Sequence, residues 1–518
     1  MPKPGRDLLR LADSVILPGF VGTTPPDWLR RRLSEGLAGV VLFSRNIVGP
    51  AQVAELTAAL HADNPAALVG VDEESGEVTR LEVAKGSSRP GNYALGVVDD
   101  VALTEELARD LGRDLAAAGV TIDFAPSADV NSNPGNPVIG LRAFGADPEL
   151  VARHTRAFVR GLQATGVAAC AKHFPGHGDT AVDSHHGVPV VAGEIEEHLF
   201  PFRAAIDEGV RAIMTGHLLV SRYDDRRPAT LSPHVLTALL REELGFEGMI
   251  ITDGIEMAAV SGAYGVGGAS AMAIAAGADA ICVGGERSDE ATAVEVRDAI
   301  AHAVLEGGLP EERLADAARR VTGLGAWSAA ARAAQGRHGG RGGHGVHGGR
   351  GVHGGVNDDG HAVEGEIGLI AARRAVRVTR RTAAPVLPLT VAPQVVEFAP
   401  EMNLAIDKGT PWGVGEPLSK LLPGTTVNRL TAEESRAAVL ENLLRAAADR
   451  PLVIVARDAH RYPWQAAAIS HLLSARADAV VVEMGLPERS DLGAVHIATY
   501  GSARVCGQAA AEAITGSL

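Results

Sequence analysis

The sequence contains few cysteines and few aromatic residues. Only three cysteines occur among 518 residues, and Cys170, Cys282 and Cys506 lie far apart, each in an apolar stretch. This number and spacing exclude a disulfide framework and a thiolate zinc site, so buried free thiols are expected. Phenylalanine, tryptophan and tyrosine together make up 4% of the residues. Alanine, glycine, valine and leucine must therefore supply most of the core.

Positive charge is also scarce. The chain carries 48 Lys and Arg against 63 Asp and Glu, which gives a net charge of −15 and a pI near 5.6. An acidic chain lacks the basic surface that binds nucleic acid or anionic membranes, so neither partner is expected. The first residues show no uninterrupted apolar core followed by a cleavage site, and no stretch reaches the length of a membrane span. A cytoplasmic location is predicted.

One segment divides the chain. Residues 336–360 consist mostly of glycine and histidine, with almost nothing apolar to bury. This composition predicts a flexible linker, which we place at 336–364. Its histidines are not expected to form a defined metal site, because a flexible segment fixes no coordination geometry. Since 518 residues exceed what one core usually holds, we predict a first domain at 1–335 and a second at 365–518.

Apolar runs alternate with amphipathic helical patterns before this linker. The runs lack internal polar alternation, which indicates strands buried on both faces in a parallel sheet under helices. Eight such units match a (β/α)8 barrel, and a doubly wound open sheet is the competing arrangement. The predicted strands lie at 14–20, 39–46, 67–74, 121–130, 167–176, 212–220, 249–257 and 279–285.

Polar side chains at the strand ends favour the barrel. A barrel gathers the carboxyl ends of its strands at one face, where active sites are built. We therefore predict a TIM-like (β/α)8 barrel with its site at this face. The side chains at or just past the ends of predicted strands are Asp72, Asp129, Lys172, His173, His217 and Asp253.

The second domain shows the same kind of alternation on a smaller scale. A helix is predicted at 366–380. Strands interleaved with further helices indicate an α/β sandwich domain. These strands are predicted at 394–400, 450–458, 477–485 and 496–501.

The segment 172–191, KHFPGHGDTAVDSHHGVPVV, carries a dense cluster of polar side chains. Pro175 and the glycines beside it exclude a helix, so His173 and His177 do not share the helical face that a zinc motif needs. No metal site is predicted. Asp183 and His185 are two residues apart, which in extended chain places both on one side, so the carboxylate can orient the imidazole. Such a histidine transfers protons well near neutral pH.

Asp253 ends the apolar run MIITD and is followed by Gly254. A carboxylate at the end of a buried strand, beside a small residue, is rigidly held and accessible to a ligand. A helix N-cap is the alternative role for this side chain. Glu256, three residues further, is interpreted as a charge in the first turn of the following helix. Glu73, Glu74 and Glu256 are not expected to be catalytic.

KHFPGHGDTAVDSH (172–185) together with GFEGMIITDGIEM (245–257) resembles glycoside hydrolase family 3, in its β-N-acetylglucosaminidase branch. VDEESGEVTRL (71–81), DFAPSADVNSNPGNPVIGLRAFG (123–145) and PATLSPHVL (228–236) fit the same pattern. The resemblance covers about residues 10–330. It extends only in general terms to the second domain, which some members carry and others lack. No cofactor is implied.

The resemblance implies a retaining exo-β-N-acetylglucosaminidase. Such an enzyme removes terminal β-linked N-acetylglucosamine from muropeptides, as in peptidoglycan turnover, or from chitooligosaccharides. Asp253 matches the nucleophile that forms a covalent glycosyl-enzyme, His185 matches the acid/base, and Asp183 matches the partner of that histidine. Most glycosidases use a second carboxylate as the acid/base. The residues that match sugar-binding positions are Asp72, Arg80, Arg142, Lys172, His173 and His217.

The chain departs from the family pattern at two positions. Relatives usually have Arg where this chain has Glu77, and often a larger residue where it has Gly254. Four alternatives to hydrolysis by Asp253 and water stay open, and one of them is a deacetylation or amidohydrolysis that needs bound zinc. Inorganic phosphate could replace water, because a neutral imidazole does not repel an anion. The substrate's acetamido oxygen could act as an internal nucleophile, or the protein could bind carbohydrate without turning it over.

Overall fold

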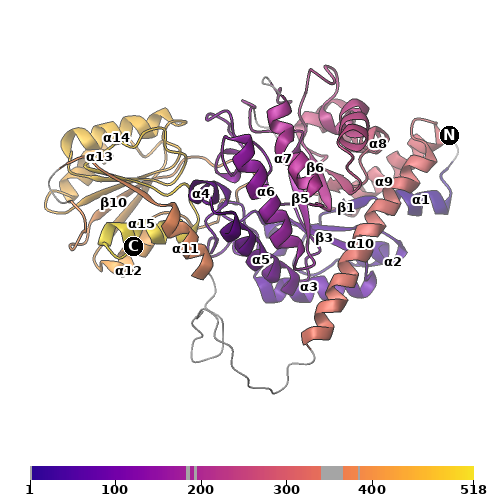
Figure 1. Cartoon of the computed structure of the whole chain (residues 1–518), viewed down its shortest axis with the longest axis horizontal. Helices are drawn as coiled ribbons and strands as arrows, with labels where there is room; N and C mark the ends of the chain where they lie inside the picture. Colours follow the sequence, from indigo (N-terminus) through magenta and orange to yellow (C-terminus); the bar gives the residue numbers. More distant parts are fainter. Residues whose placement is uncertain (1–2, 183–186, 192–194, 340–365, 383–385) are drawn as a thin grey trace. The chain divides into compact units, whose positions relative to one another are not determined.

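The computed structural model describes residues 3–182, 187–191, 195–339, 366–382 and 386–518 (Figure 1). The chain divides into two compact units. Loops 75–100 and 140–145 lie well before the predicted linker in the sequence, yet they belong to the second unit. Unit 1 comprises Met1–Glu74, Val101–Ile139 and Ala146–His353, and unit 2 comprises Ser75–Asp100, Gly140–Gly145 and Gly354–Leu518.

A curled sheet of parallel strands forms the centre of unit 1. Within the described residues its six strands adjoin in chain order, and a seventh and eighth strand pair with each other. The backbone N–H of Thr252 donates to the carbonyl of Ala280, which joins the two sheets. Every strand predicted before the linker is present, and the strand residues are buried, as the absence of polar alternation indicated. The six are β2 (Gly39–Leu42), β3 (Leu68–Val71), β4 (Ile122–Asp123), β5 (Ala168–Phe174), β6 (Ala212–Thr215) and β7 (Met249–Thr252), and the pair is β1 (Ile16–Pro18) with β8 (Ile281–Val283).

Helices lie between successive strands and surround this sheet (Figure 1). Their starts follow local chemistry: Asp147 caps α6 by accepting from the backbone N–H groups of Glu149 and Leu150. The helices are α1 (Arg6–Asp13), α2 (Asp27–Glu35), α3 (Pro50–Asp63), α5 (Val101–Ala117), α6 (Pro148–Gln163), α7 (Ile195–Asp207), the π-helix η4 (His234–Glu243), α8 (Ala258–Ala276), α9 (Glu290–Leu305) and α10 (Glu311–Gly339).

Helix α8 corrects one expectation from the sequence. By length and apolar composition it is a stretch that could cross a membrane. Its backbone is interrupted, however, at Gly265, whose φ of 67° and ψ of 163° are not helical. Val266 and Ile274 are buried, and a Cβ added at Gly267 would lie 2.9 Å from the Cβ of Ala299 on α9. This close approach shows that α8 packs against α9 within unit 1.

Unit 2 contains a second sheet. In the part of the chain that the structure describes, the strand order is β11-β10-β12-β13-β14-β9, with only β9 antiparallel. The chain goes from β10 outward to β11 and then back to β12, so the direction of winding reverses beside β10. In open α/β sheets, ligands bind at the carboxyl edge next to such a reversal. The strands are β9 (Arg377–Arg380), β10 (Gln394–Phe398), β11 (Thr426–Leu430), β12 (Leu452–Ala456), β13 (Val480–Glu483) and β14 (Val495–Ala498).

Helices and loops complete this second unit. Helices α4 (Asn92–Val98), α11 (Glu366–Ala375), α12 (Gly415–Leu421), α13 (Ala437–Ala446), α14 (Pro463–Ala475) and α15 (Arg504–Thr515) belong to it. Its core combines strand residues such as Val395, Val453 and Val482 with Ala509 and Ile514 of α15.

Two elements of unit 2 differ from the prediction. The helix expected at 366–380 ends at Ala375, and β9 follows it, paired with β14. The sequence analysis also missed β11, because four of its five residues are exposed and it has no apolar run. Both are edge strands, where a weak apolar pattern is expected. Helix α10 continues to Gly339, inside the segment predicted as a linker, and the rest of that segment, 340–365, lies outside the described residues.

Candidate active site

Asp253 stands immediately after β7, at the carboxyl end of a fully buried strand. Its backbone N–H donates to the carbonyl of Thr215 at 3.2 Å, and its Oδ1 accepts from the N–H of Gly254 at 2.7 Å. The N-cap of α8 is Met257, so Asp253 does not cap that helix. The side chain is partly exposed. The backbone thus fixes this carboxylate without burying it, and the N-cap alternative is wrong.

Lys172, on β5, lies between two carboxylates from the segment after β3. Its Nζ is 2.6 Å from Asp72 Oδ1 and 2.7 Å from Glu74 Oε1. The lysine side chain is 2% exposed, whereas that of Asp72 is 23% exposed. A buried ammonium is tolerated when opposite charges pair with it. Glu74 therefore holds Lys172 in place, while Asp72 also reaches the surface.

Cys170 on β5 is a buried free thiol in the core of unit 1. Burial raises the pKa of the Cys170 thiol on β5, and the charge of Lys172 opposes that rise. The carboxylates of Asp72, Asp123 and Asp253 raise the same pKa further. A direct contact between β5 and the segment after β3 is the pair of Lys172 Nζ with Asp72 Oδ1, at 2.6 Å. Asp72 and Lys172 are thus paired with each other, and the convergence of Asp253 with them stays a prediction.

Asp129 organises the two histidines of the polar cluster. Its Oδ2 lies 2.7 Å from His173 Nδ1, and its Oδ1 accepts the backbone N–H of His177 at 2.7 Å. Burial alone would raise the pKa of Asp129, but His173 and His177 reverse this effect and the pKa is lowered. The ionised carboxylate therefore holds the imidazole of His173 by Nδ1. Ser127 donates to the same carboxylate at 3.0 Å.

His217 uses both ring nitrogens within the protein. Its Nε2 is 3.0 Å from the carbonyl of Gly254, and its Nδ1 is 2.8 Å from the Thr230 hydroxyl. Because a carbonyl only accepts, Nε2 must carry the proton that is donated to Gly254. The sequence analysis assigned His217 to the sugar. The structure shows its Nε2 donating to the residue that follows Asp253, and its role in sugar binding stays a prediction.

The remaining predicted site residues belong to unit 2 or lie outside the described residues. Arg80 and Arg142 belong to unit 2 and are buried. Arg80 donates from Nη2 to the carbonyl of Ala405 at 3.0 Å, and the carbonyl of Arg142 accepts from Asn92 at 2.8 Å. Asp183 and His185 lie outside the described residues. Among the residues that the structure describes, no group of three or more His, Cys, Asp or Glu is arranged to hold a metal ion.

Glu256 has a role that the sequence analysis missed. It precedes α8, so its interpretation as a first-turn charge is wrong. Its Oε1 accepts the backbone N–H of Gly284 at 2.8 Å and also that of Gly285. Arg45 holds the same segment by donating to the carbonyls of Gly284 and Gly285, the latter at 2.8 Å. Burial raises the pKa of Glu256, and the backbone donors counteract the rise.

Glu256 thus ties the loop after β8 to the loop that carries the Asp253 carboxylate, while Arg45 ties it to the segment after β2. The signal in the sequence was the pair of glycines after β8. Consecutive glycines leave backbone N–H groups open to an acceptor. Gly254 itself is not required by space, since a Cβ there would meet Glu256 Oε2 at 3.5 Å, an ordinary contact.

Replacing Glu256 by alanine is expected to lower kcat by about 10- to 100-fold, with a much smaller change in KM. Releasing the loop after β8 lets the backbone near Asp253 shift, and small misplacements of reacting groups are costly. Steady-state kinetics on an aryl glycoside, the substrate type that the family resemblance implies, measure the effect. Glu286→Ala is the matched control, because only the backbone of Glu286 contacts Glu256. Equal kcat for both variants would contradict the prediction.

Comparison with known proteins decides the family. The model of the Glycosyl hydrolase family 3 N terminal domain matches residues 28–324. The chain belongs to glycosyl hydrolase family 3. A solved family 3 β-N-acetylglucosaminidase from Paenibacillus sp. str. FPU-7 is 33% identical to this family 3 chain, with a TM-score of 0.84. That match covers 99% of this chain and 97% of the other.

Two relatives known as β-hexosaminidases are also similar to this family 3 chain. The enzyme of Xylella fastidiosa (strain M23) is 38% identical over 283 residues, which are 52% of this chain and 83% of that protein. β-Hexosaminidase A of Pseudoalteromonas piscicida is 35% identical over 265 residues, which are 46% of this chain. The match spans only 44% of that relative's length. The protein is thus a glycoside hydrolase of the β-hexosaminidase and β-N-acetylglucosaminidase group.

Proposed function

We propose that this family 3 hydrolase is a retaining exo-β-N-acetylglucosaminidase with Asp253 as its nucleophile. The observation that carries the proposal is the position of Asp253. Its partly exposed carboxylate follows β7 and is held by backbone hydrogen bonds, and we propose that it faces an interior shared with Asp72 and Lys172. The names of the relatives support a hexosamine substrate. We also propose that β1 to β8 form one closed (β/α)8 barrel around this interior.

In the proposed reaction, Asp253 attacks the anomeric carbon and displaces the aglycone, forming a glycosyl ester. His185, oriented by Asp183, gives a proton to the departing oxygen. The same histidine then removes a proton from water, which attacks the anomeric carbon and releases Asp253. Two displacements retain the β configuration. The roles of Asp183 and His185 rest on the sequence.

The other residues are assigned to binding. Asp72 and Lys172 suit neighbouring sugar hydroxyls, because a carboxylate accepts and an ammonium donates hydrogen bonds. His173 is presented by Asp129, and Arg80 and Arg142 are assigned to the same sugar from the sequence. His217 acts through Gly254 as a positioning residue. We propose muropeptides or chitooligosaccharides with a terminal β-linked N-acetylglucosamine as substrates.

A product analysis tests the proposal. The protein is incubated with a chitooligosaccharide and with a muropeptide that carries terminal β-linked N-acetylglucosamine, each with and without inorganic phosphate. Proton NMR should show β-N-acetylglucosamine as the first product in both buffers. N-Acetylglucosamine 1-phosphate would identify phosphate as the acceptor. An initial α-anomer, or no release from any β-N-acetylglucosaminide, would overturn the proposal.

A further inference from the structure

Glu77, which replaces the arginine usual in the family, has a partner far along the chain. Its carboxylate forms an ion pair with the guanidinium of Arg457, and its Oε2 accepts from the Ser502 hydroxyl at 3.1 Å. The side chains of Arg457 and Glu77 are 3% and 11% exposed. All three residues belong to unit 2. A buried ion pair of this kind fixes how two segments meet, because breaking it leaves an uncompensated charge.

The pair lies at the carboxyl edge of the unit 2 sheet. Arg457 directly follows β12, and Ser502 lies in the segment after β14. Gln465 on α14 secures the backbone of Arg457 from both sides, accepting from its N–H at 3.2 Å and donating to its carbonyl at 2.9 Å. The guanidinium also lies 5.7 Å from the ring centre of Trp412. β12 flanks β10, beside which the winding of the sheet reverses.

The rest of loop 75–100 follows the same edge. Arg504 donates from Nε to the carbonyl of Gly86 at 3.3 Å. A Cβ added at Gly501 would lie 2.6 Å from the carbonyl oxygen of Pro90, so the two backbones touch. Arg80, on this loop, donates to the carbonyl of Ala405. The loop therefore occupies the edge at which open α/β sheets commonly bind a ligand.

We propose that the carboxyl edge of the unit 2 sheet is a docking surface for the enzyme's own loop 75–100. The Glu77–Arg457 pair sets the register of that loop and, through it, the position of Arg80. Glu77 and Arg457 are thus positioning residues for sugar affinity. This inference rests on the proposed function, in which Arg80 binds the hexosamine. The exchange of arginine for glutamate at position 77 is matched by a basic partner, Arg457, directly after β12.

The test separates binding from chemistry. Glu77→Gln and Arg457→Gln are each expected to raise KM about tenfold and to change kcat less than twofold, because loss of uniform binding acts on KM alone. The charge exchange Glu77→Arg with Arg457→Glu should restore most of the affinity. Glu512→Gln breaks the pair with Arg373 in the same unit and serves as the control. It should leave KM unchanged.

Hydrogen exchange gives a second measurement that does not depend on turnover. In Glu77→Gln, the amide hydrogens of peptides covering residues 75–91 should exchange faster, because the loop has lost its ion pair with Arg457. In Glu512→Gln, the same peptides should exchange as in the wild-type protein. Unchanged hydrogen exchange in Glu77→Gln would overturn the inference. A KM that stays high in the double variant with Glu77→Arg and Arg457→Glu would overturn it as well. If the wild-type protein hydrolyses no β-N-acetylglucosaminide, the proposed function fails. The hydrogen-exchange measurement still decides whether Glu77 holds the loop.

Discussion

Replacement of Asp253 by alanine is expected to lower kcat on an aryl β-N-acetylglucosaminide about 10⁴-fold or more. Loss of a nucleophile removes the route through the covalent intermediate, and nucleophile deletions in other hydrolases cost at least this much. The side chain is partly exposed, so the melting temperature should change little. The comparison of kcat with thermal denaturation separates lost chemistry from lost folding.

Asp253→Asn and labelling by a fluorinated sugar refine this test. Asn keeps the size and an acceptor for the Gly254 N–H but removes the charge, so a similar loss is expected. A 5-fluoro glycosyl fluoride should label the wild-type peptide that contains Asp253 and leave the variants unlabelled. Asp225→Ala, at an exposed carboxylate, is the control. Substantial hydrolysis by Asp253→Ala would favour attack by the substrate's acetamido oxygen.

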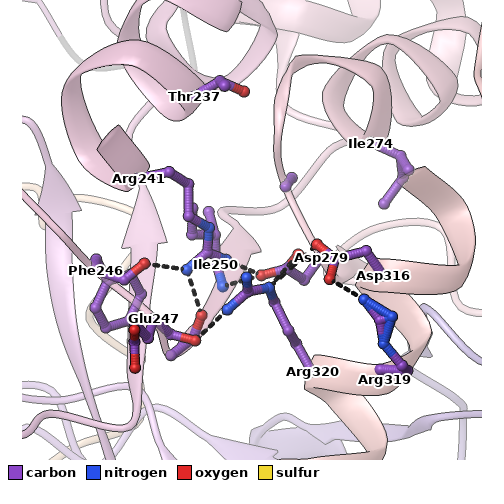
Figure 2. Close-up of polar contacts among 12 residues, drawn as sticks. Thr237, Arg241, Phe246, Glu247, Ile250, Ile274, Asp279, Asp316, Arg319 and Arg320 are labelled. Carbon is purple, nitrogen blue, oxygen red and sulfur yellow. Dashed lines mark hydrogen bonds and ion pairs between the residues drawn. The ribbon is translucent and has the colours of Figure 1, made fainter. Parts of the chain in front are cut away.

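Replacement of Asp279 by alanine is expected to lower the free energy of unfolding by about 3–5 kcal/mol. Asp279 is fully buried and forms ion pairs with Arg241 of η4 and with Arg313 of α10, the latter at 2.5 Å. Its Oδ2 also accepts the N–H of Ile250 on β7 at 2.9 Å. Figure 2 shows Arg241 and Arg320 pointing toward this carboxylate.

The arginines explain the size of this effect. Burial lowers the pKa of Arg241 to about 10, so the guanidinium stays charged at neutral pH and loses its main partner in the variant. Denaturant unfolding measures the cost. Adding Arg241→Met to Asp279→Ala should recover part of it, because a buried charge is then removed as well. A loss below about 1 kcal/mol would show that the cluster is solvated like a surface pair.

The two variants should also differ in activity. Asp279 precedes β8, whereas Asp253 follows β7, so the two lie at opposite ends of the parallel strands. In barrels the amino-terminal face serves stability and the carboxyl-terminal face serves catalysis. The folded fraction of Asp279→Ala should therefore keep the wild-type kcat. A large fall in kcat would contradict this division.

The local sequence was sufficient to predict the strands of unit 1 and the place of Asp253. Strands buried on both faces are uniformly apolar, so each one stands out from its neighbours. A polar residue that ends such a run lies at the carboxyl edge whatever the rest of the chain does. The positions of Asp72 and Asp253 follow from this rule, whereas Lys172 lies within β5. The exposed edges β9 and β11 have no such pattern and were missed.

Only the tertiary structure determined which side chains meet. Glu77 and Arg457 are 380 positions apart in the chain, and Glu256 reaches Gly284 from a different loop. No periodicity encodes such pairs, because they depend on how loops from distant elements come together. His217 is the same case: its type and strand end suggested a sugar ligand, while Gly254 and Thr230 use both ring nitrogens. The position of a strand can be read from the local sequence, whereas the contacts between distant side chains depend on the folded chain.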